Sequence, residues 1–538
     1  MTFRRGRLFA VALAAICLAP ATAHAQGIPT PEQHFGFKMG TEGKLPTWAK
    51  TKEYFKLIGD RSPKADYFVE GKTTEGDDYP YLIISSAQNM GRLNQILDAN
   101  NRLAEAKGLT QEAAAELASQ TVPVYLIEAM MHSTEAANMP AIVDIVHRFA
   151  TENSPYTREV LNNAVIVVIP AANPDGWRKV GDYFNQTANT DYARTYPDLY
   201  HHFACHDDNR DWFLFTQAET QHRINLTQRF NPVVEHFMHQ QGATGSRIFV
   251  PPWAEPVSAN LDPIAHESGN ALGLEIGKYL TADGYKGVQH SMGTQNSYGI
   301  MFSADVATYT SWRGASLLLT ETAGQRDLAY TYTGQNPLGP QGRSMDVPDP
   351  YRSNTWTLEQ ASEYAKAALY AGVRSVARNH EDWLLNTLYK TTSKSLSATD
   401  VPWAYVLPAG QRDAYAVYET LRTLELADVK IERATAPFTA GGKSYPAGSY
   451  VLKTQQRMGR FVNQILDNAT YPQWARPCAT CPLTMPYSEF TDSVPIFFGL
   501  TAEPVASAFT AATEPVATVA PEPVLLPAAP PAHANSCG

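Results

Sequence analysis

Short apolar runs alternate with amphipathic stretches in the N-terminal part of the chain. The runs at 79–86, 122–130 and 164–170 are apolar at nearly every position, which predicts strands buried on both faces. The segments 90–106 and 135–150 carry apolar residues at helical spacing, which predicts helices. This alternation indicates an α/β fold with a mixed, mostly parallel twisted sheet that helices cover on both faces.

A second, smaller α/β unit is predicted after residue 390. The segment 403–408 is strand-like, 413–426 is helical and 429–433 is strand-like, which is a βαβ pattern. From about residue 502 the composition turns to Ala, Pro, Val and Glu, which predicts a flexible tail because such a segment buries little apolar surface. The predicted units are a main unit at 26–390, an accessory unit at 391–501 and a tail at 502–538.

The N-terminus has the pattern of a signal peptide. Three arginines precede an apolar run at 8–20, and alanines at positions 23 and 25 favour cleavage before Gln26. The run has about 13 residues, fewer than the ~20 that span a bilayer. We therefore predict an exported protein, periplasmic or secreted, whose first 25 residues are removed.

Charge and cysteine content narrow the choice of partners and compartment. The formal charge is −10, from 43 Lys and Arg against 53 Asp and Glu, which argues against nucleic-acid binding. Cys478 and Cys481 form a single C-x-x-C, and the sequence holds no second one to complete a four-thiolate zinc site. In an oxidising compartment a local disulfide is therefore the simpler interpretation.

A His-x-x-Glu motif carries the first chemical signal. His132 and Glu135 follow a predicted buried strand and lie at the start of a predicted helix. An imidazole and a carboxylate three residues apart in a first helical turn can point at one metal ion. The alternative is a carboxylate at a helix N-terminus beside an incidental histidine.

Further polar motifs follow in a fixed order, most of them after predicted strands. They are Asn173-Pro174-Asp175-Gly176, Asn209-Arg210, His239 after the strand at 233–238, and Glu321 at the end of the apolar strand 317–320. Each motif alone is common, since Asn-Pro-Asp-Gly is also an ordinary turn sequence. The ordered set resembles the zinc carboxypeptidase family, the metallocarboxypeptidases related to carboxypeptidase A. The form around Asn209 is similar to that of larger, exported bacterial members.

The resemblance implies a role for each matched residue. His132, Glu135 and His239 would hold one Zn²⁺ and leave a position open for water or substrate. Glu321 would act as general base on a zinc-activated water. Arg210, with Asn209, would bind the terminal carboxylate of a peptide. The expected function is an exported zinc metallocarboxypeptidase that hydrolyses C-terminal peptide bonds, with a peptide that has a free C-terminal carboxylate as its partner.

Two more catalytic residues follow from the resemblance by position. Arg194 lies close to where the family has an arginine that stabilises the tetrahedral intermediate, although a solvated surface arginine would look the same. Tyr298 lies 23 residues before Glu321 and matches the family's substrate-covering tyrosine, with Tyr309 as the alternative.

One position departs from the family pattern. The family commonly has an acid two residues before the third zinc ligand, whereas this chain has Phe237 there. A missing acceptor for a ligand histidine costs about 10- to 100-fold in metal affinity or activity. His236 is a rival ligand, but in a regular strand it faces away from the side of His239.

Two other functions remain open from the sequence. One is an amidase or deacylase that acts on cell-wall peptides or acylated amino acids. The other is a peptide-binding protein without turnover, which Phe237 favours and Glu321 opposes. The preferred C-terminal side chain also stays open, because Asp305 favours a basic residue and Val306 an apolar one.

Overall fold

The computed structural model of the protein describes most of the chain. The described residues are 27–201, 207–253, 256–290, 309–468, 471–476, 478–484 and 493–520. The predicted signal peptide at 1–25 lies outside them.

Within the described residues, eight strands form the main sheet. Its order is β1-β2-β4-β3-β5-β8-β6-β7. The middle strands β4, β3, β5 and β8 are parallel, while β1, β2 and β6 pair antiparallel with their inner neighbours. The strands are β1 (Ala65–Lys72), β2 (Asp78–Ile84), β3 (Val124–Glu128), β4 (Val165–Ile169), β5 (Val234–Gln241), β6 (Ile248–Val250), β7 (Val288–His290) and β8 (Ser316–Ala323). The mixed, mostly parallel sheet expected from the sequence is confirmed.

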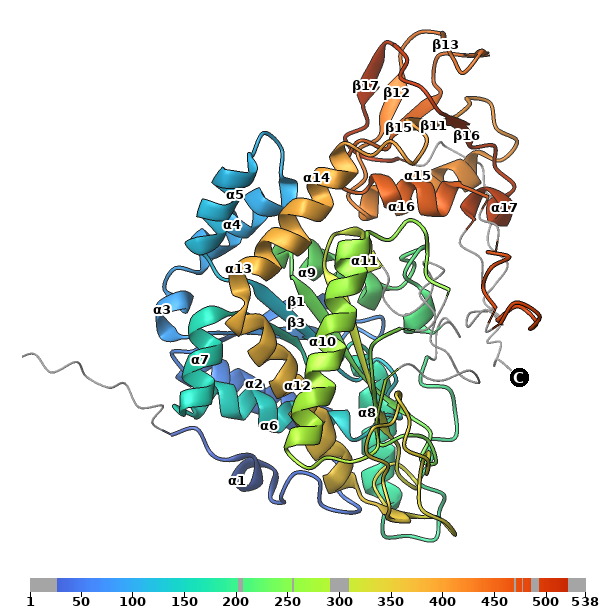
Figure 1. The fold of residues 1–538 in the computed structure, drawn as a ribbon. Helices are drawn as coiled ribbons and strands as arrows, with labels where there is room; N and C mark the ends of the chain where they lie inside the picture. The colour runs from blue at the N-terminus through green and yellow to red at the C-terminus, as the bar shows by residue number, and fades with distance from the viewer. Residues whose placement is uncertain are drawn as a thin grey trace, which may run out of the picture.

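Helices cover both faces of this sheet, because alternate residues of its central strands enter different cores. In β4, Ile166 and Val168 face one core, whereas Val165, Val167 and Ile169 face another. The first core also holds α2, α6, α7, α10 and α12, and the second holds α4 and α9. Figure 1 shows α10 and α12 crossing in front of the sheet.

The helices of the main unit are numbered in chain order. They are α1 (Pro31–Phe35), α2 (Trp48–Arg61), α3 (Ala87–Met90), α4 (Leu93–Glu105), α5 (Gln111–Ser119), α6 (Asn138–Thr151), α7 (Pro155–Asn163), α8 (Pro174–Thr187), η1 (Asp208–Arg210), α9 (Ala218–Phe230), α10 (Pro263–Ala282), α11 (Tyr309–Trp312), α12 (Leu358–Arg378), α13 (His380–Trp383) and η2 (Leu384–Lys390). A short ladder joins β9 (Tyr332–Thr333) to β10 (Thr355–Trp356).

One helix start differs from the prediction in a way that matters for the site. The predicted helix 135–150 is α6, which begins only at Asn138. Residues 131–137 form turns, with the N–H of Glu135 donating to the carbonyl of His132 at 3.0 Å. The His-x-x-Glu motif therefore lies in a loop before the helix and not in a first helical turn. Because the motif lies in one short turn, the side chains of His132 and Glu135 can point toward the same place.

The accessory unit that follows residue 390 is built around a second sheet. Its order is β16-β11-β15-β12-β17, and both β11 and β12 pair antiparallel with β15. Strands β11 and β12 are thus parallel with β15 between them, so the predicted βαβ pattern is a split one. The elements are α14 (Thr391–Leu396), β11 (Ala404–Leu407), α15 (Ala414–Leu426), β12 (Glu432–Ala434), β13 (Phe438–Ala440), β14 (Lys443–Tyr445), β15 (Tyr450–Lys453), α16 (Gly459–Leu466), α17 (Val494–Phe498), β16 (Glu503–Val505) and β17 (Thr513–Pro515).

The described part of the predicted tail is ordered, which corrects the expectation of a flexible segment from residue 502. Strands β16 and β17 form the two edges of the accessory sheet and pair with β11 and β12. Each contains a proline, Pro504 or Pro515, which an edge strand tolerates because one side of its backbone needs no partner. Val505 is buried against the accessory core. Residues 521–538 lie outside the described residues.

The accessory unit shares a core with the main sheet. Leu317 and Leu319 of β8 belong to the same buried cluster as Phe461 of α16. The ring of Phe461 lies 5.8 Å from that of Trp312 and 6.3 Å from that of Phe215. Figure 1 shows the accessory unit seated beside α9 and α11. It therefore completes the cover of one face of the main sheet.

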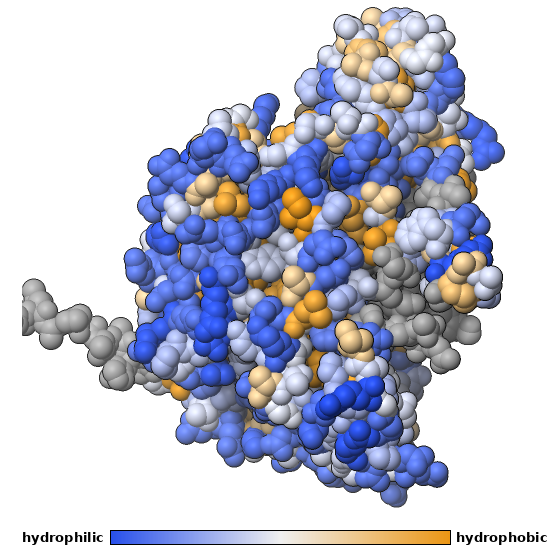
Figure 2. Space-filling model, viewed as in Figure 1, coloured by the Kyte–Doolittle hydropathy of each residue, from blue (hydrophilic) through white to orange (hydrophobic). Residues whose placement is uncertain are grey.

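The surface and the cysteines add two observations. The face shown in Figure 2 is mostly hydrophilic, with smaller apolar areas between, and none of the described helices is long and apolar enough to span a bilayer. Cys478 and Cys481 form a disulfide, as the sequence predicted.

Candidate metal centre and active site

The loop that carries His132 and Glu135 is tied to the neighbouring strand β5. The side-chain amide of Asn138 donates to the carbonyl of Met238 at 2.9 Å. The backbone N–H of Ala137 donates to the side chain of Gln240 at 2.8 Å. These contacts fix the loop against the end of β5, where His239 lies.

The pairing of β5 with β8 brings His239 beside Glu321. The two residues are register partners in a parallel ladder, so their side chains leave the sheet on the same side. Both are buried, with 2% and 5% of their surfaces exposed. Leu319 and Phe237, two residues earlier on each strand, face the same buried cluster. Regular strand geometry therefore places the predicted third ligand and the predicted base next to each other.

His132, Glu135 and His239 converge on one point. The Nδ1 atoms of the two histidines lie 3.2 Å apart, and the Nδ1 of His239 lies 3.1 Å from Oε2 of Glu135. Ligand atoms about 2.0–2.1 Å from a tetrahedral Zn²⁺ lie about 3.3 Å from each other. All three ligand atoms fall within 4.8 Å of one another. The donor set and its spacing fit a zinc ion.

The charges around these side chains favour a cation. Burial lowers the pKa of His132, but the carboxylates of Glu135 and Asp207 outweigh it and raise that pKa well above its usual value. Burial raises the pKa of Glu135, but His239 and His132 outweigh it and lower that pKa. Without a metal ion, the cluster of His132, Glu135 and His239 therefore binds a proton tightly. A divalent cation and that proton compete for the same atoms.

Asp207 orients His132, a contact that sequence reasoning missed. Its Oδ1 lies 3.1 Å from Nε2 of His132 and accepts the backbone N–H of Asn209 at 2.8 Å. A carboxylate on the outer nitrogen fixes the tautomer of a metal-binding histidine. Position 237, where an acid was sought as a partner for His239, holds Phe237, which packs edge-on against Trp212 at 5.8 Å. The signal in the sequence was the acid two positions before Asn209.

His236 belongs to the core and not to the metal site, in agreement with the choice of His239. Its Nδ1 lies 3.0 Å from the hydroxyl of Tyr125, and its Nε2 lies 2.9 Å from the hydroxyl of Thr320. Burial and the nearby His239 lower its pKa to about 3, so the ring is neutral. Both of its nitrogens are occupied by core partners.

The Asn-Pro-Asp-Gly motif supports the metal-ligand loop. Asn173 caps α8, and its side chain accepts the N–H of Gly176 at 2.8 Å. A Cβ at position 176 would collide with the hydroxyl of Ser133, which lies between the two metal ligands. Only glycine lets the first turn of α8 pack this closely. The motif acts here as a structural support.

Asn209 and Arg210 lie in η1, directly after Asp207. The indole N–H of Trp212 donates to Oδ1 of Asn209 at 3.1 Å. Asn209 is buried and Arg210 is partly exposed. Both residues therefore lie within three positions of Asp207, whose carboxylate contacts His132.

A buried arginine anchors the segment 207–212. Arg223 of α9 has no exposed surface and donates to the carbonyl of Asp208 at 3.0 Å. Its guanidinium lies 4.3 Å from the ring centre of Trp212 and 3.6 Å from the carboxylate of Glu128 at the end of β3. The 207–212 segment is thus fastened to both β3 and α9.

A cavity of about 420 Å³ opens beside the metal ligands. His132, Glu135 and Asp207 line it together with Tyr200, which sequence reasoning did not single out. Burial is the largest cause that raises the pKa of Tyr200, so its hydroxyl keeps its proton. The volume lies within the range of about 300–1,000 Å³ that small ligands occupy.

Of the two catalytic residues assigned by position alone, Arg194 and Tyr298, the structure describes only Arg194. Arg194 lies with its guanidinium 4.8 Å from the ring centre of Tyr330 and 3.9 Å from the carboxylate of Asp327. Leu328, the residue after Asp327, lines the cavity beside the metal ligands, whereas Arg194 is not among its lining residues. Tyr298 lies outside the described residues, as do Asp305 and Val306. Tyr309, the alternative, is buried at the seam with the accessory unit, where its ring lies 6.0 Å from Phe461.

Fold and site together define a metallopeptidase of the zinc carboxypeptidase type. The chain belongs to the zinc carboxypeptidase family, whose model matches residues 51–420. Members of this family are zinc-dependent, so Zn²⁺ is the ion that the His, Glu and His ligands are expected to hold.

Solved structures of carboxypeptidases resemble the chain at low sequence identity. The carboxypeptidase A of Helicoverpa armigera is 16% identical, with 64% of this chain and 79% of that chain covered and a TM-score of 0.41. A metallo-carboxypeptidase of Burkholderia cenocepacia is 13% identical, with 61% and 68% covered and a TM-score of 0.38. A metallo-carboxypeptidase of Pseudomonas aeruginosa, solved with (2-guanidinoethylmercapto)succinic acid, is 12% identical, with 62% and 69% covered and a TM-score of 0.38. None of the curated proteins matches the chain.

Proposed function

We propose that the protein is an exported zinc metallocarboxypeptidase that removes C-terminal residues from peptides. The observation that carries the proposal is the convergence of His132, Glu135 and His239 beside Glu321, at the carboxyl ends of parallel strands. In open α/β sheets ligands bind at that edge. Three protein ligands leave one coordination position for water or substrate, as a catalytic site requires.

The residues around the metal have different roles in the proposed reaction. When bound, Zn²⁺ supplies a Lewis acid that polarises the scissile carbonyl and makes water more acidic. Glu321 takes the proton from the attacking water and later passes it to the departing amine. Asp207 holds the imidazole of His132 in the tautomer that leaves its Nδ1 free for the metal.

Arg210 gives the reaction its preference for chain ends. Its planar guanidinium binds the terminal carboxylate of the peptide through two parallel hydrogen bonds, and Asn209 contributes its side-chain NH₂. Arg194 supplies positive charge to the developing oxyanion. Tyr298 covers the substrate. The proposal includes cleavage of the chain after Ala25 on export.

Replacement of the base tests the mechanism. Glu321→Gln should lower peptide hydrolysis by about 10²- to 10⁴-fold while one zinc per chain stays bound. The control is Glu267→Gln, because Glu267 is exposed and lies on α10. Full activity in Glu321→Gln would refute the assigned base, and loss of zinc in it would mean that Glu321 is itself a ligand.

The alternative amidase or deacylase differs in substrate and not in metal chemistry. A peptide with a C-terminal amide, compared with the same peptide with a free carboxylate, separates the two functions. A carboxypeptidase should cleave the free form at least about ten times faster, because an ionic hydrogen bond to Arg210 contributes about 1.5–3 kcal/mol. Arg210→Gln should abolish that difference. Equal rates on both peptides in the native protein would favour the amidase.

A further inference from the structure

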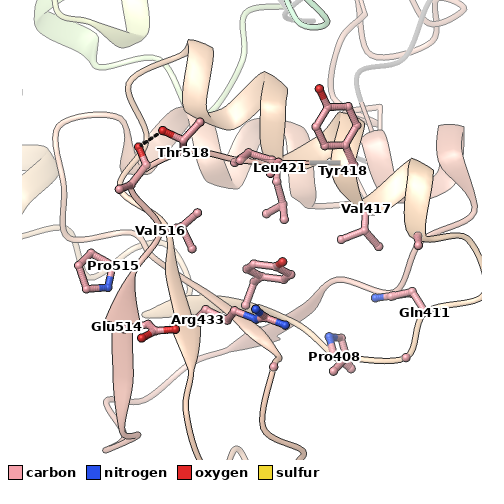
Figure 3. A pocket seen from close by; sticks show the side chains of 18 residues that line it. Pro408, Gln411, Val417, Tyr418, Leu421, Arg433, Glu514, Pro515, Val516 and Thr518 are labelled. Atoms are coloured by element: carbon pink, nitrogen blue, oxygen red, sulfur yellow. Dashed lines mark hydrogen bonds between the residues drawn. The ribbon is translucent and has the colours of Figure 1, made fainter. Parts of the chain in front are cut away.

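A cavity of about 570 Å³ lies in the accessory unit, away from the metal ligands. Four segments of the accessory unit line it: the loop before α15, one face of α15, the sheet, and the chain after β17 (Figure 3). It has no lining residue in common with the cavity beside His132. The volume lies within the range of about 300–1,000 Å³ typical of small-molecule sites.

The walls of this cavity are held in place. The N–H of Val519 donates to the carboxylate of Glu425 at 3.2 Å, and the N–H of Val516 donates to the carbonyl of Ile431 at 2.9 Å. On the opposite side, the side chain of Gln411 exchanges two hydrogen bonds with the backbone of Thr501. The space is therefore bordered by anchored backbone.

One wall of the cavity is apolar. Val417 and Leu421 of α15 point into the space from above, and Val516 points into it from the segment after β17 (Figure 3). Tyr450 and Val519 add further apolar surface. Burial of an apolar ligand side chain against such a wall is favourable by about 25 cal/mol per Å².

Two opposite charges face this apolar wall without neutralising each other. Arg433 of β12 and Glu514 of β17 are register partners, so both side chains leave the sheet on the same side. Within the described part of the chain, neither side chain makes an ion pair or a hydrogen bond, and the guanidinium of Arg433 lies 5.8 Å from the ring centre of Tyr450. Figure 3 shows the guanidinium of Arg433 directed toward the middle of the cavity and away from Glu514.

The geometry points to a binding site for a small zwitterion with an apolar side chain, either a free amino acid or a dipeptide. Arg433 binds its carboxylate, Glu514 binds its ammonium group, and the valine and leucine wall takes its side chain. A carboxylate on an arginine and an ammonium on a glutamate are charge-assisted hydrogen bonds. The site is separate from the proposed zinc centre and does not depend on hydrolysis.

Binding of leucine and its blocked forms to the full chain tests the site. Isothermal titration should show one saturable site for leucine or leucyl-leucine in a protein that carries both Glu321→Gln and Arg210→Gln, so that the dipeptide is not hydrolysed and the proposed carboxylate-binding arginine of the zinc site is absent. N-acetyl-leucine lacks only the ammonium group, and N-acetyl-leucinamide lacks both charges. The ratio of affinities for leucine and leucyl-leucine identifies which of the two the site prefers.

The variants of Arg433 and Glu514 are expected to weaken the binding of different ligands. Arg433→Gln should weaken leucine and N-acetyl-leucine alike, by about 10- to 100-fold, because one hydrogen bond to a charged group contributes about 1.5–3 kcal/mol. Glu514→Gln should weaken leucine by a similar factor and leave N-acetyl-leucine unchanged. Arg343→Gln, at an exposed arginine of the main unit, should change neither.

Three results would overturn the proposal. The first is the absence of saturable binding of both leucine and leucyl-leucine. The second is unchanged affinity in Arg433→Gln. The third is N-acetyl-leucinamide binding as tightly as leucine, which would mean that apolar contact alone holds the ligand. Arg433 and Glu514 are both exposed at the surface, so these variants are expected to fold.

Discussion

The cavity beside His132 and the cavity in the accessory unit differ in how their charged groups are held. In the first, each ligand side chain has a neighbour that fixes it: Asp207 contacts His132, and Glu135 lies between His132 and His239. In the second, Arg433 and Glu514 are exposed side chains that face a fixed apolar wall. The first arrangement is preorganised for chemistry, and the second suits reversible binding.

The difference also explains why one cavity depends on distant parts of the chain. The metal-ligand cavity needs β3, β5, β8 and the 207–212 segment to meet, and that segment rests on Arg223 and on the seam with the accessory unit. The accessory cavity needs only segments of the accessory unit itself. Substitutions at the seam should therefore disturb catalysis more than ligand binding by the accessory unit.

The largest expected effect comes from removal of a metal ligand. His239→Ala should lose bound zinc and lower hydrolysis by more than about 100-fold, because loss of a ligand costs more than loss of its outer partner. His236→Gln is the matched control on the same strand. It should keep its zinc and lose about 1–3 kcal/mol of unfolding free energy through its core hydrogen bonds. Elemental analysis and urea unfolding measure the two quantities, and zinc loss in His236→Gln would contradict the ligand assignment.

Removal of a ring at the seam should destabilise the fold. Phe461→Ala is expected to cost about 3–5 kcal/mol of unfolding free energy, because Phe461 is fully buried among Phe215, Tyr309 and Trp312. Urea unfolding measures it, with the exposed Ile496→Ala as the control within about 0.5 kcal/mol. A cost below about 1 kcal/mol would show that the two units do not share a core.

The carboxylate that orients His132 should matter less than the ligands themselves. Asp207→Asn is expected to lower zinc affinity or kcat/KM by about 10- to 100-fold. Asp191→Asn, at an exposed position before the same segment, should change neither. Competition with a chelator measures zinc affinity. An unchanged affinity and rate in Asp207→Asn would show that the contact with His132 is incidental.

The pH dependence follows from the raised pKa of His132. In the metal-free protein the proton on His132 stabilises the fold below the unfolded pKa of about 6.5, and this stabilisation is lost as the pH rises through the raised folded pKa. Zinc must displace that proton. Apparent zinc affinity should therefore rise up to about tenfold per pH unit until the pH reaches the folded pKa.

Calorimetry in buffers of different ionisation enthalpy counts the proton that zinc releases. Asp207→Asn should shift the plateau of zinc affinity to lower pH, because Asp207 is one of the groups that raise the pKa of His132. We expect zinc affinity to rise from pH 6 up to the raised pKa of His132. A constant zinc affinity over this range would contradict the competition between zinc and the proton.

The smallest effect is expected from the accessory cavity on hydrolysis. Arg433→Gln should change kcat/KM by no more than about twofold, since a surface substitution away from the site is worth within about 0.5 kcal/mol. A larger change would mean that the two cavities are coupled through α15, whose Thr423 hydroxyl donates to the carbonyl of Leu214 at 3.3 Å.

The main unit could be predicted from the sequence because its central strands are buried on both faces. The predicted strand 122–130 contains β3 (Val124–Glu128), and 164–170 contains β4 (Val165–Ile169). Apolar runs of this kind have few alternative interpretations. The register that sets His239 beside Glu321 pairs residues far apart in the chain, and no local pattern encodes it. The resemblance to a known family supplied that pairing.

The accessory cavity could not be predicted, because its outer wall lies in the segment assigned to the tail. Strands β16 and β17 have three residues each and contain prolines, which local patterns count against a strand. They form because the edges of the accessory sheet offer backbone partners. Asp207 was missed for a related reason: its partner His132 lies 75 residues earlier.

The proposed carboxypeptidase activity and its base can be tested in one digestion experiment. A mixed peptide library is digested with the native protein and with Glu321→Gln, the products are read by mass spectrometry, and the zinc content of both proteins is determined. We expect the native protein to remove single residues from free C-termini, Glu321→Gln to give no such products, and each protein to bind one zinc. Internal cleavage, cleavage by the variant or native protein that binds no zinc would contradict it.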